Sequence, residues 1–201
     1  MSSIHESMAA EISCWGKWFQ AVRTQRPGLY FVAGQTASGK NIVLKITRTL
    51  LASSGVRAVD SAGIVEIDAM LKGIVVVHGE VCDVAGMQRV VDLASVGAVV
   101  LCSMHARSVR SALWRIRSPM LGESLDVVGP HLRAVMAQIL VPKMTQGRTC
   151  INELAVFRTA LDIQKVLEIG VDHSLREDAG SKVASGIVSR ASAERAGVLD
   201  R

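Results

Sequence analysis

Short apolar runs alternate with amphipathic segments along the first half of the chain. The runs have the length and composition of buried strands, and they cover residues 29–32, 56–59, 74–77 and 98–102. Between them, apolar positions recur every three or four residues, which predicts helices over 42–53, 64–71 and 83–96. This alternation predicts an α/β fold in which helices cover both faces of a mainly parallel sheet.

The remaining segments are more helical. An apolar stripe predicts an N-terminal helix that ends before Pro27, and it consists of Met8, Ile12, Trp15, Phe19 and Val22. The second half predicts helices over 109–116 and 125–136, a hairpin of 139–143 and 149–154, and helices broken by glycine from residue 159 onward. We predict one domain, with an α/β core over 1–158 and a helical C-terminal extension over 159–201.

One loop carries the strongest chemical signal. It lies between an apolar strand and a helix and consists of Gly34, Gln35, Thr36, Ala37, Ser38, Gly39, Lys40 and Asn41. This spacing is that of a Walker A phosphate loop, in which the glycines let backbone N–H groups face phosphate oxygens and the lysine reaches the outer phosphates. Asn41 stands where a serine or threonine hydroxyl would ligate Mg²⁺, so it is at best a weak metal ligand.

Two further candidates follow predicted strands. Glu80 comes after the third apolar run, and His105 comes after the fourth. Because the carboxyl ends of parallel strands meet at one edge of a sheet, both residues should lie near the phosphate loop. A carboxylate there could orient water or metal, and a histidine could contact the γ-phosphate. A solvated glutamate and a structural histidine are the alternatives.

Composition narrows the class of protein. The 201 residues are 49% apolar, and the net charge is +5 with an isoelectric point near 9.3. Aromatic residues make up only 3%, so stacking platforms for nucleic acid are scarce and we expect no direct nucleic-acid binding. We find neither a transmembrane segment nor a signal peptide and expect a cytoplasmic protein. The four cysteines are too far apart for a zinc site.

Several sequence blocks together resemble one family. They are Gly34-Gln-Thr-Ala-Ser-Gly-Lys40, Val76-Val-His-Gly-Glu80-Val-Cys-Asp83, Leu101-Cys-Ser-Met-His105, Ala137-Gln-Ile-Leu-Val-Pro-Lys143 with Gly147, Arg148 and Glu153, and Gly186-Ile-Val-Ser-Arg-Ala-Ser-Ala-Glu194. Their order is similar to that of the motor ATPases of type IV pili and type II secretion. The resemblance spans roughly residues 25–198 and is more specific than a phosphate loop alone.

The resemblance implies a RecA-like P-loop NTPase core that binds ATP and Mg²⁺. Lys40 would then be the phosphate-loop lysine, Glu80 the catalytic carboxylate and His105 the histidine of the family's histidine box. It also implies a homo-hexamer, or association with a full-length motor ATPase, at the pilus or secretion machinery of the inner membrane.

Departures from the family pattern predict slow or absent ATP hydrolysis. The stretch between Lys40 and Glu80 lacks a recognisable acidic box, and Cys82 stands where the pattern has an arginine. The N-terminal domain that contributes arginines to the family's nucleotide site is expected to be missing. Losing such an arginine reduces the rate by about 10³- to 10⁵-fold. We therefore expect an ATP-binding protein with weak or no stand-alone hydrolysis, and an ATPase if it is active.

Two other functions stay open. The chain could be a non-catalytic interaction subunit of a pilus or secretion complex with a vestigial nucleotide site. It could also be a small-molecule P-loop kinase, which needs a lid that carries arginine. Arg107, Arg110, Arg115 and Arg117 could form such a lid, although a row of this kind more often lies on a solvated helix face.

Overall fold

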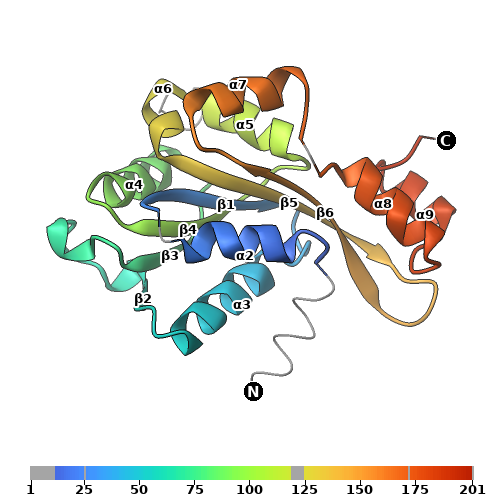
Figure 1. The fold of residues 1–201 in the computed structure, drawn as a ribbon, viewed down its shortest axis with the longest axis horizontal. Helices are drawn as coiled ribbons and strands as arrows, with labels where there is room; N and C mark the ends of the chain where they lie inside the picture. Colours follow the sequence, from blue (N-terminus) through green and yellow to red (C-terminus); the bar gives the residue numbers. More distant parts are fainter. Residues whose placement is uncertain (1–11, 25, 119–124, 172, 201) are drawn as a thin grey trace.

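The computed structural model describes residues 12–24, 26–118, 125–171 and 173–200. Its strands form one sheet in the order β2-β3-β4-β1-β5-β6 (Figure 1). Their bounds are β1 Gly28–Gly34, β2 Ala58–Asp60, β3 Val75–Glu80, β4 Val99–Met104, β5 Leu132–Pro142 and β6 Arg148–Val156. All neighbouring pairs run parallel except β5 with β6, which is antiparallel. The predicted mainly parallel sheet is confirmed.

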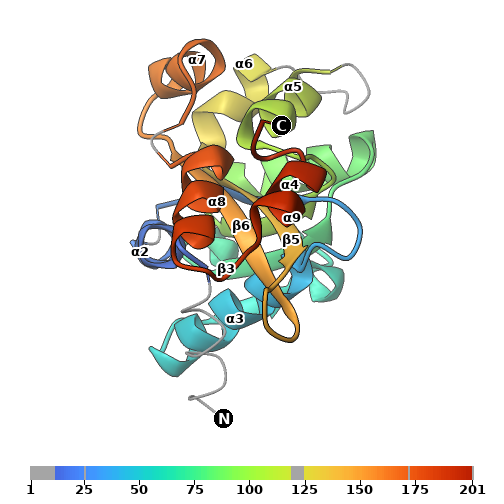
Figure 2. The same cartoon turned by 90° about the vertical axis from the view of Figure 1, so that its right-hand side faces the viewer.

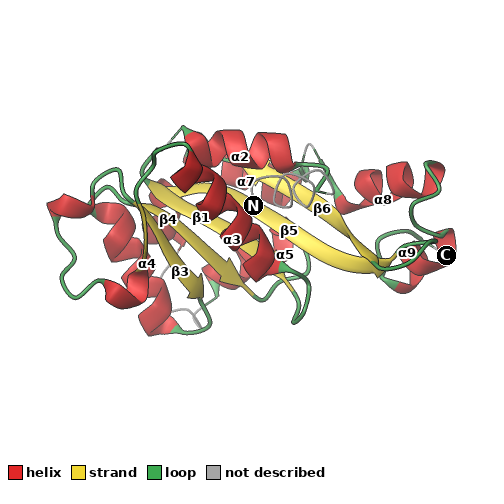
Figure 3. Cartoon of the chain, turned by 90° about the horizontal axis from the view of Figure 1, so that it is seen from below, coloured by secondary structure: helices red, strands yellow, loops and turns green. Residues whose placement is uncertain are grey.

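Helices cover both faces of this sheet. Figures 1 and 3 place α2 (Trp15–Arg23) and α3 (Lys40–Ser53) on one face. The other face carries α4 (Val84–Ser95), α5 (Val109–Arg117), α6 (Leu125–Val128) and α7 (Ala160–Glu168). Strand β1 lies between β4 and β5 and is buried along its whole length, so its alternate residues serve two cores. Phe31 packs on the α4 side, and Tyr30 and Val32 pack on the α2 side.

Several predicted boundaries agree with the structure. Helix α4 begins after Asp83, whose side chain accepts a hydrogen bond from the Gly86 N–H at 2.8 Å as an N-cap. Helix α3 ends at Ser53, as the Ser-Ser-Gly sequence predicted. Helix α2 ends at Arg23, before Pro27 as predicted, but it begins only at Trp15, so Ile12 precedes the helix and still packs in the same core. The predicted contribution of Met8 lies outside the described residues.

The predicted helix over 64–71 is wrong. The structure has only 3-10 turns there, at Ser61–Gly63 and Ala69–Leu71. Asp68 explains the break, because its side chain accepts a hydrogen bond from the Met70 N–H and so favours a turn over a continuous helix. The neighbouring strand is also shifted and covers Ala58–Asp60 instead of 56–59.

The predicted helix over 125–136 is wrong as well. Helix α6 ends at Val128, the 3-10 turn Gly129–His131 follows, and β5 begins at Leu132. Strand β5 lies inside the sheet between β1 and β6, where helices cover both faces, and most of its residues are therefore buried and apolar. Such a continuous apolar run cannot be distinguished from a buried helix by periodicity alone.

The hairpin of β5 and β6 carries the C-terminal helices. Figures 2 and 3 show α8 (Leu175–Ala184) and α9 (Arg190–Arg195) beside the far part of this hairpin. A separate small core joins them, and it consists of Val141, Ile151, Ala179, Val188, Ala193 and Val198. The predicted helical C-terminal region is confirmed, and it packs directly against the sheet.

Candidate nucleotide-binding site

The phosphate loop, residues 34–41, connects the carboxyl end of β1 to the N-terminus of α3. Gly39 caps the helix in the left-handed region with φ of +92°, and Ala37 also has a positive φ of +60°. The loop therefore reverses direction tightly and leads into a helix of 14 residues. The free N–H groups and the helix dipole at this end favour an anion.

Both glycines of the loop are required by close packing. A Cβ atom on Gly34 would overlap Ser38 Oγ and lie 2.8 Å from the backbone oxygen of Gln138. A Cβ atom on Gly39 would lie 2.6 Å from Gln138 Nε2, in a backbone conformation that already disfavours side chains. The loop is thus pressed against β5, and the pattern of glycines follows from that contact.

Lys40 points back over the loop. Its Nζ donates hydrogen bonds to the backbone oxygens of Gly34, at 2.9 Å, and Gln35, at 3.0 Å. Burial lowers the pKa of Lys40 from its usual value, and the negative charge of Glu80 opposes that shift. An anion bound beside the ammonium would stabilise its charged form in the same way.

Glu80 and His105 lie opposite the loop and contact each other. Glu80 is in register with Ser103 on β4, so the adjacent strands bring the two residues to the same edge of the sheet. His105 Nε2 lies 2.8 Å from Glu80 Oε1. Sequence reasoning placed these residues near the loop but did not foresee that they would pair.

These groups surround one cavity of about 350 Å³. Its lining combines most of the predicted residues with two apolar ones: Thr36, Ala37, Ser38, Gly39, Lys40, Asn41, Ile42, Glu80, His105 and Leu140. Ser38 Oγ is buried there and has no hydrogen-bond partner within the described part of the chain. An unpaired polar atom in this position suits a ligand that supplies an acceptor or a donor.

The two predicted residues that do not line this cavity lie next to it. Gly34 packs under the loop, and Gln35 lines a neighbouring hollow of about 330 Å³ with Thr36, His105, Ala106 and Arg107. Arg107 also donates a hydrogen bond to the backbone oxygen of Ala196, at 3.0 Å, directly after α9. The edge of the site is therefore linked to the C-terminal helices.

The four arginines considered for a kinase lid are not grouped at the site. Arg107 alone among them lines either hollow near the phosphate loop. Arg110, Arg115 and Arg117 lie on α5, where Arg117 stacks on Trp114 with its guanidinium carbon 5.4 Å from the ring centre. These three residues thus belong to a helix surface.

Sequence reasoning missed the role of Gln138. This residue on β5 is buried, and its Nε2 donates a hydrogen bond of 2.6 Å to the backbone oxygen of Ser38. It ties the phosphate loop to the sheet. Gln138 belongs to one of the sequence blocks that carried the family resemblance, so the signal was present, but the local pattern predicted no contact with the loop.

We expect Gln138→Leu to lower the free energy of unfolding by about 1–3 kcal/mol, because the Ser38 carbonyl would be left without its buried donor. Chemical denaturation measures this change. Gln88→Leu is the matched control, since the amide of Gln88 bonds Asp92 on an exposed helix face. An equal effect of both substitutions would contradict the assigned role of Gln138.

A magnesium ion would find few protein ligands here. The described residues contain no group of three or more histidine, cysteine, aspartate or glutamate side chains that could hold a metal. Mg²⁺ on a nucleotide usually keeps several waters and takes one or two protein oxygens besides the phosphates. Asn41 and Glu80 both line the cavity and fit that limited role.

Comparison with solved structures gives clear matches in fold. The Legionella pneumophila ATPase DotB matches with a TM-score of 0.72 and 19% identity, over 91% of this chain and 64% of DotB. The Yersinia pseudotuberculosis ATPase DotB matches with a TM-score of 0.68 and 17% identity, over 88% of this chain and 60% of its own. The pilus retraction motor PilT, solved with bound ADP, matches with a TM-score of 0.72 and 16% identity, over 90% of this chain and 64% of PilT.

The predicted likeness to pilus and secretion motor ATPases is confirmed at the level of the fold, a mostly parallel sheet flanked by helices that matches the core of DotB and PilT. The chain spans less than two thirds of the length of these neighbours. Neither a protein-family model nor a curated protein matches the sequence. No helix in the described ranges is long and apolar enough to cross a bilayer.

Proposed function

We propose that this chain binds ATP together with Mg²⁺ at the phosphate loop. The observation that carries the proposal is the cavity in which Lys40, the N-terminus of α3 and the Glu80–His105 pair converge. Backbone N–H groups and Lys40 would bind the phosphates. Asn41 and Glu80 would hold the metal, which would supply positive charge to the phosphate oxygens when bound.

We further propose that stand-alone hydrolysis is weak or absent. Phosphoryl transfer depends almost entirely on positioning and on stabilising charge, so each missing group lowers the rate more than the affinity. Asn41 offers no hydroxyl to the metal. The carboxylate of Glu80, which would have to orient the attacking water, is instead in contact with His105, whose Nε2 lies 2.8 Å from it.

The fold similarity supports a motor-like context for this activity. We propose that residues 1–158 are the nucleotide-binding core and 159–201 its helical extension. In that context the chain forms a homo-hexamer or joins a full-length motor ATPase on the cytoplasmic side of a pilus or secretion system. Sedimentation of the purified chain with and without ATP tests self-assembly directly.

One observation favours a second candidate, a non-catalytic subunit whose nucleotide site is vestigial. Glu80 and His105, which catalysis would require, contact each other. This contact is compatible with a site that no longer hydrolyses ATP. In this case the chain would co-purify with a complete motor ATPase in the same amount whether or not Lys40 is intact. A loss of co-purification in Lys40→Ala would instead favour the nucleotide-dependent function.

Titration with a fluorescent ATP analogue, with and without Mg²⁺, tests the primary proposal. We expect saturable binding that strengthens when Mg²⁺ is added, because the metal offsets the phosphate charge near Glu80. Equal affinity for the ATP analogue with and without Mg²⁺ would contradict the roles given to Asn41 and Glu80. Absence of binding would contradict the proposal as a whole.

Steady-state hydrolysis tests the predicted weak chemistry. We expect turnover on the order of 10⁻³ s⁻¹ or slower, which is the range of P-loop enzymes without an arginine on the transferred phosphate. Glu80→Gln should lower this residual rate at least about tenfold, and it should reduce the gain in nucleotide affinity that Mg²⁺ provides, because Glu80 is one of the two proposed metal ligands. Glu66→Gln is the control, because Glu66 is exposed and does not line the cavity. Fast hydrolysis that Lys40→Ala abolishes would overturn the weak-ATPase prediction.

A further inference from the structure

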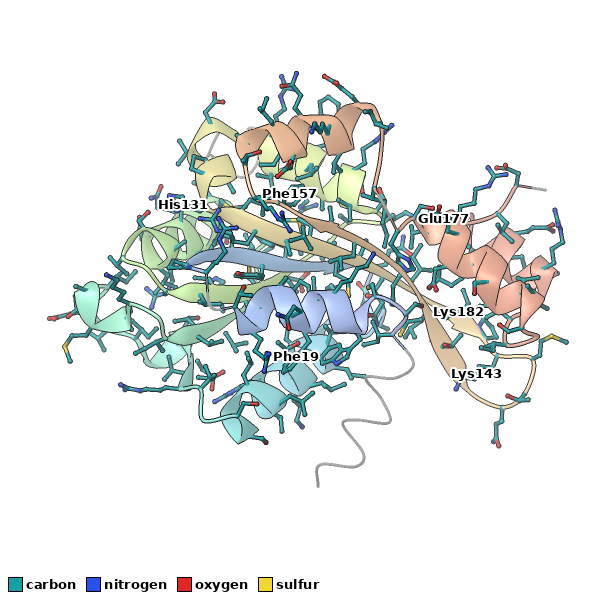
Figure 4. All side chains as sticks on the ribbon, in the orientation of Figure 1. Phe19, His131, Lys143, Phe157, Glu177 and Lys182 are labelled. Atoms are coloured by element: carbon teal, nitrogen blue, oxygen red, sulfur yellow. The ribbon has the colours of Figure 1, made fainter. Side chains whose placement is uncertain are left out.

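A second cavity, of about 550 Å³, lies away from the phosphate loop. It is bordered by α2, by the residues before β1, by the start of β5 and by the end of β6. Since β1 and β5 run parallel and the phosphate loop follows β1, this cavity lies toward the opposite end of these strands. Phe157, which lines it, is labelled in Figure 4.

The charged side chains that line this cavity all carry or can carry positive charge. They are Lys17, Arg26, Arg133, Arg158 and His173, and no carboxylate is among the lining residues. The ion pairs recorded between described residues do not involve the first four of these side chains. Positive charge collected in a hollow without a counter-ion favours an anionic ligand.

Arg133 is fixed in place by the backbone. Its Nε donates to the oxygen of Pro27 at 2.9 Å, and its Nη1 donates to the oxygen of Pro130 at 2.7 Å. Burial lowers the pKa of Arg133, and the nearby charge of Arg26 lowers it further. Arg133 is therefore preorganised, and the charge of the exposed Arg26 acts on it. Guanidinium groups in such a place can bind phosphate or carboxylate oxygens.

The carboxylate recorded as an ion-pair partner of His173 is already engaged. Asp178 Oδ1 lies 4.0 Å from His173 Nε2, but Asp178 also accepts hydrogen bonds from Lys182 Nζ and from the Asn152 N–H. The His173 Nε2 atom itself is buried without a hydrogen-bond partner in the described residues. Asp178 therefore neutralises Lys182. Two further carboxylates near Arg158 and His173 bond the backbone: Asp162 accepts from the Arg158 N–H, and Glu177 accepts from the Ser174 N–H. Among the described residues, no recorded ion pair compensates the side chains of Lys17, Arg26, Arg133 and Arg158.

The remaining lining contains apolar and aromatic residues besides the polar Gln20 and Thr24. Tyr30, Leu154, Val156 and Phe157 contribute to it, and the volume lies within the range of about 300–1,000 Å³ typical of small-molecule sites. We propose that this cavity binds a small organic ligand that carries phosphate groups, with its phosphates at Arg26, Arg133 and Arg158 and its apolar part against Val156, whose side chain is exposed. This site is separate from the phosphate loop and independent of the function proposed for it.

Tyr30 provides a local probe, because it is the single tyrosine of the chain. Its hydroxyl donates a hydrogen bond to the Arg26 oxygen at 2.9 Å, so a ligand at Arg26 should change its environment. With ring-¹³C-labelled tyrosine, we expect one NMR signal that shifts saturably as inorganic tripolyphosphate is added. The same shift should occur in Lys40→Ala, which disables the phosphate loop. Loss of anion binding at the cavity can therefore be distinguished from loss of nucleotide binding at the phosphate loop.

Paired charge substitutions test which residues bind. Arg26→Gln with Arg158→Gln should weaken tripolyphosphate binding at least about tenfold, since each charged hydrogen bond contributes about 1.5–3 kcal/mol. Both side chains are exposed, so these changes should leave the fold intact. Arg57→Gln with Arg148→Gln removes the same charge from exposed positions outside the cavity and should change affinity by less than about twofold.

Three results would overturn the proposal. The Tyr30 signal could fail to shift, or shift without saturating, in which case the cavity holds no anion. The control pair could weaken binding as much as the cavity pair, which would show attraction to overall charge only. Citrate could bind as tightly as tripolyphosphate, which would show that the site does not select phosphate.

Discussion

Replacing Lys40 with alanine is expected to weaken ATP binding by at least about 100-fold. A charged hydrogen bond is worth about 1.5–3 kcal/mol, and the ammonium is placed to contact more than one phosphate oxygen. Lys40 is buried at the loop and already oriented by the backbone oxygens of Gly34 and Gln35, so little conformational entropy is lost when phosphate binds. Titration with the fluorescent analogue measures the change.

The control for Lys40→Ala is Lys45→Ala on the same helix. Lys45 is exposed and does not line the cavity, so its removal takes away the same charge without touching the site. Lys40→Met keeps the apolar stem of the side chain and should lose affinity to a similar extent with less effect on folding. If Lys45→Ala weakened binding equally, the nucleotide would be held by general electrostatic attraction instead of by the loop.

The elements that could be predicted from the sequence are those whose signal is local. The phosphate loop is a contiguous stretch of residues with fixed spacing, and Gly34 and Gly39 appear in it because their neighbours leave no room for a Cβ atom. Glu80 and His105 were placed near the loop by one topological rule, that parallel strands end at the same edge. Their mutual contact at 2.8 Å is a matter of side-chain position, which that rule does not give.

The features that could not be predicted depend on contacts between distant segments. The first part of β5, up to Met136, was assigned to a helix because its apolar pattern fits either element, whereas residues 139–143 were correctly predicted as a strand of the hairpin. With the first part misassigned, Gln138 could not be connected with Ser38, from which it is separated by 100 residues. The basic cavity likewise gathers cations from Lys17 to His173, and no local pattern signals such a cluster.

Replacing Lys182 with methionine is expected to lower the free energy of unfolding by about 3–5 kcal/mol, because it leaves the carboxylate of Asp178 buried without its counter-charge. The two side chains are 9% and 2% exposed, and their charged atoms lie 2.7 Å apart. Lys182 also donates to Ser13 Oγ and to the Cys150 oxygen, and Asp178 accepts from the Asn152 N–H. Figure 4 labels Lys182 where α8 meets the hairpin of β5 and β6.

The matched control is Arg190→Met, which breaks an ion pair of nearly the same length, 2.8 Å, with the same helical spacing. The side chains of Arg190 and its partner Glu194 are 70% and 25% exposed, so water replaces the lost partner. The free energy of unfolding should therefore change by less than about 0.5 kcal/mol. Combining Lys182→Met with Asp178→Asn should recover part of the loss, because the uncompensated charge is then absent while an oxygen acceptor stays. Urea denaturation measures all three. If Lys182→Met were no more destabilising than Arg190→Met, the buried pair would not be what fixes α8 to the sheet, and the small core around Val141 and Ala179 would have to suffice.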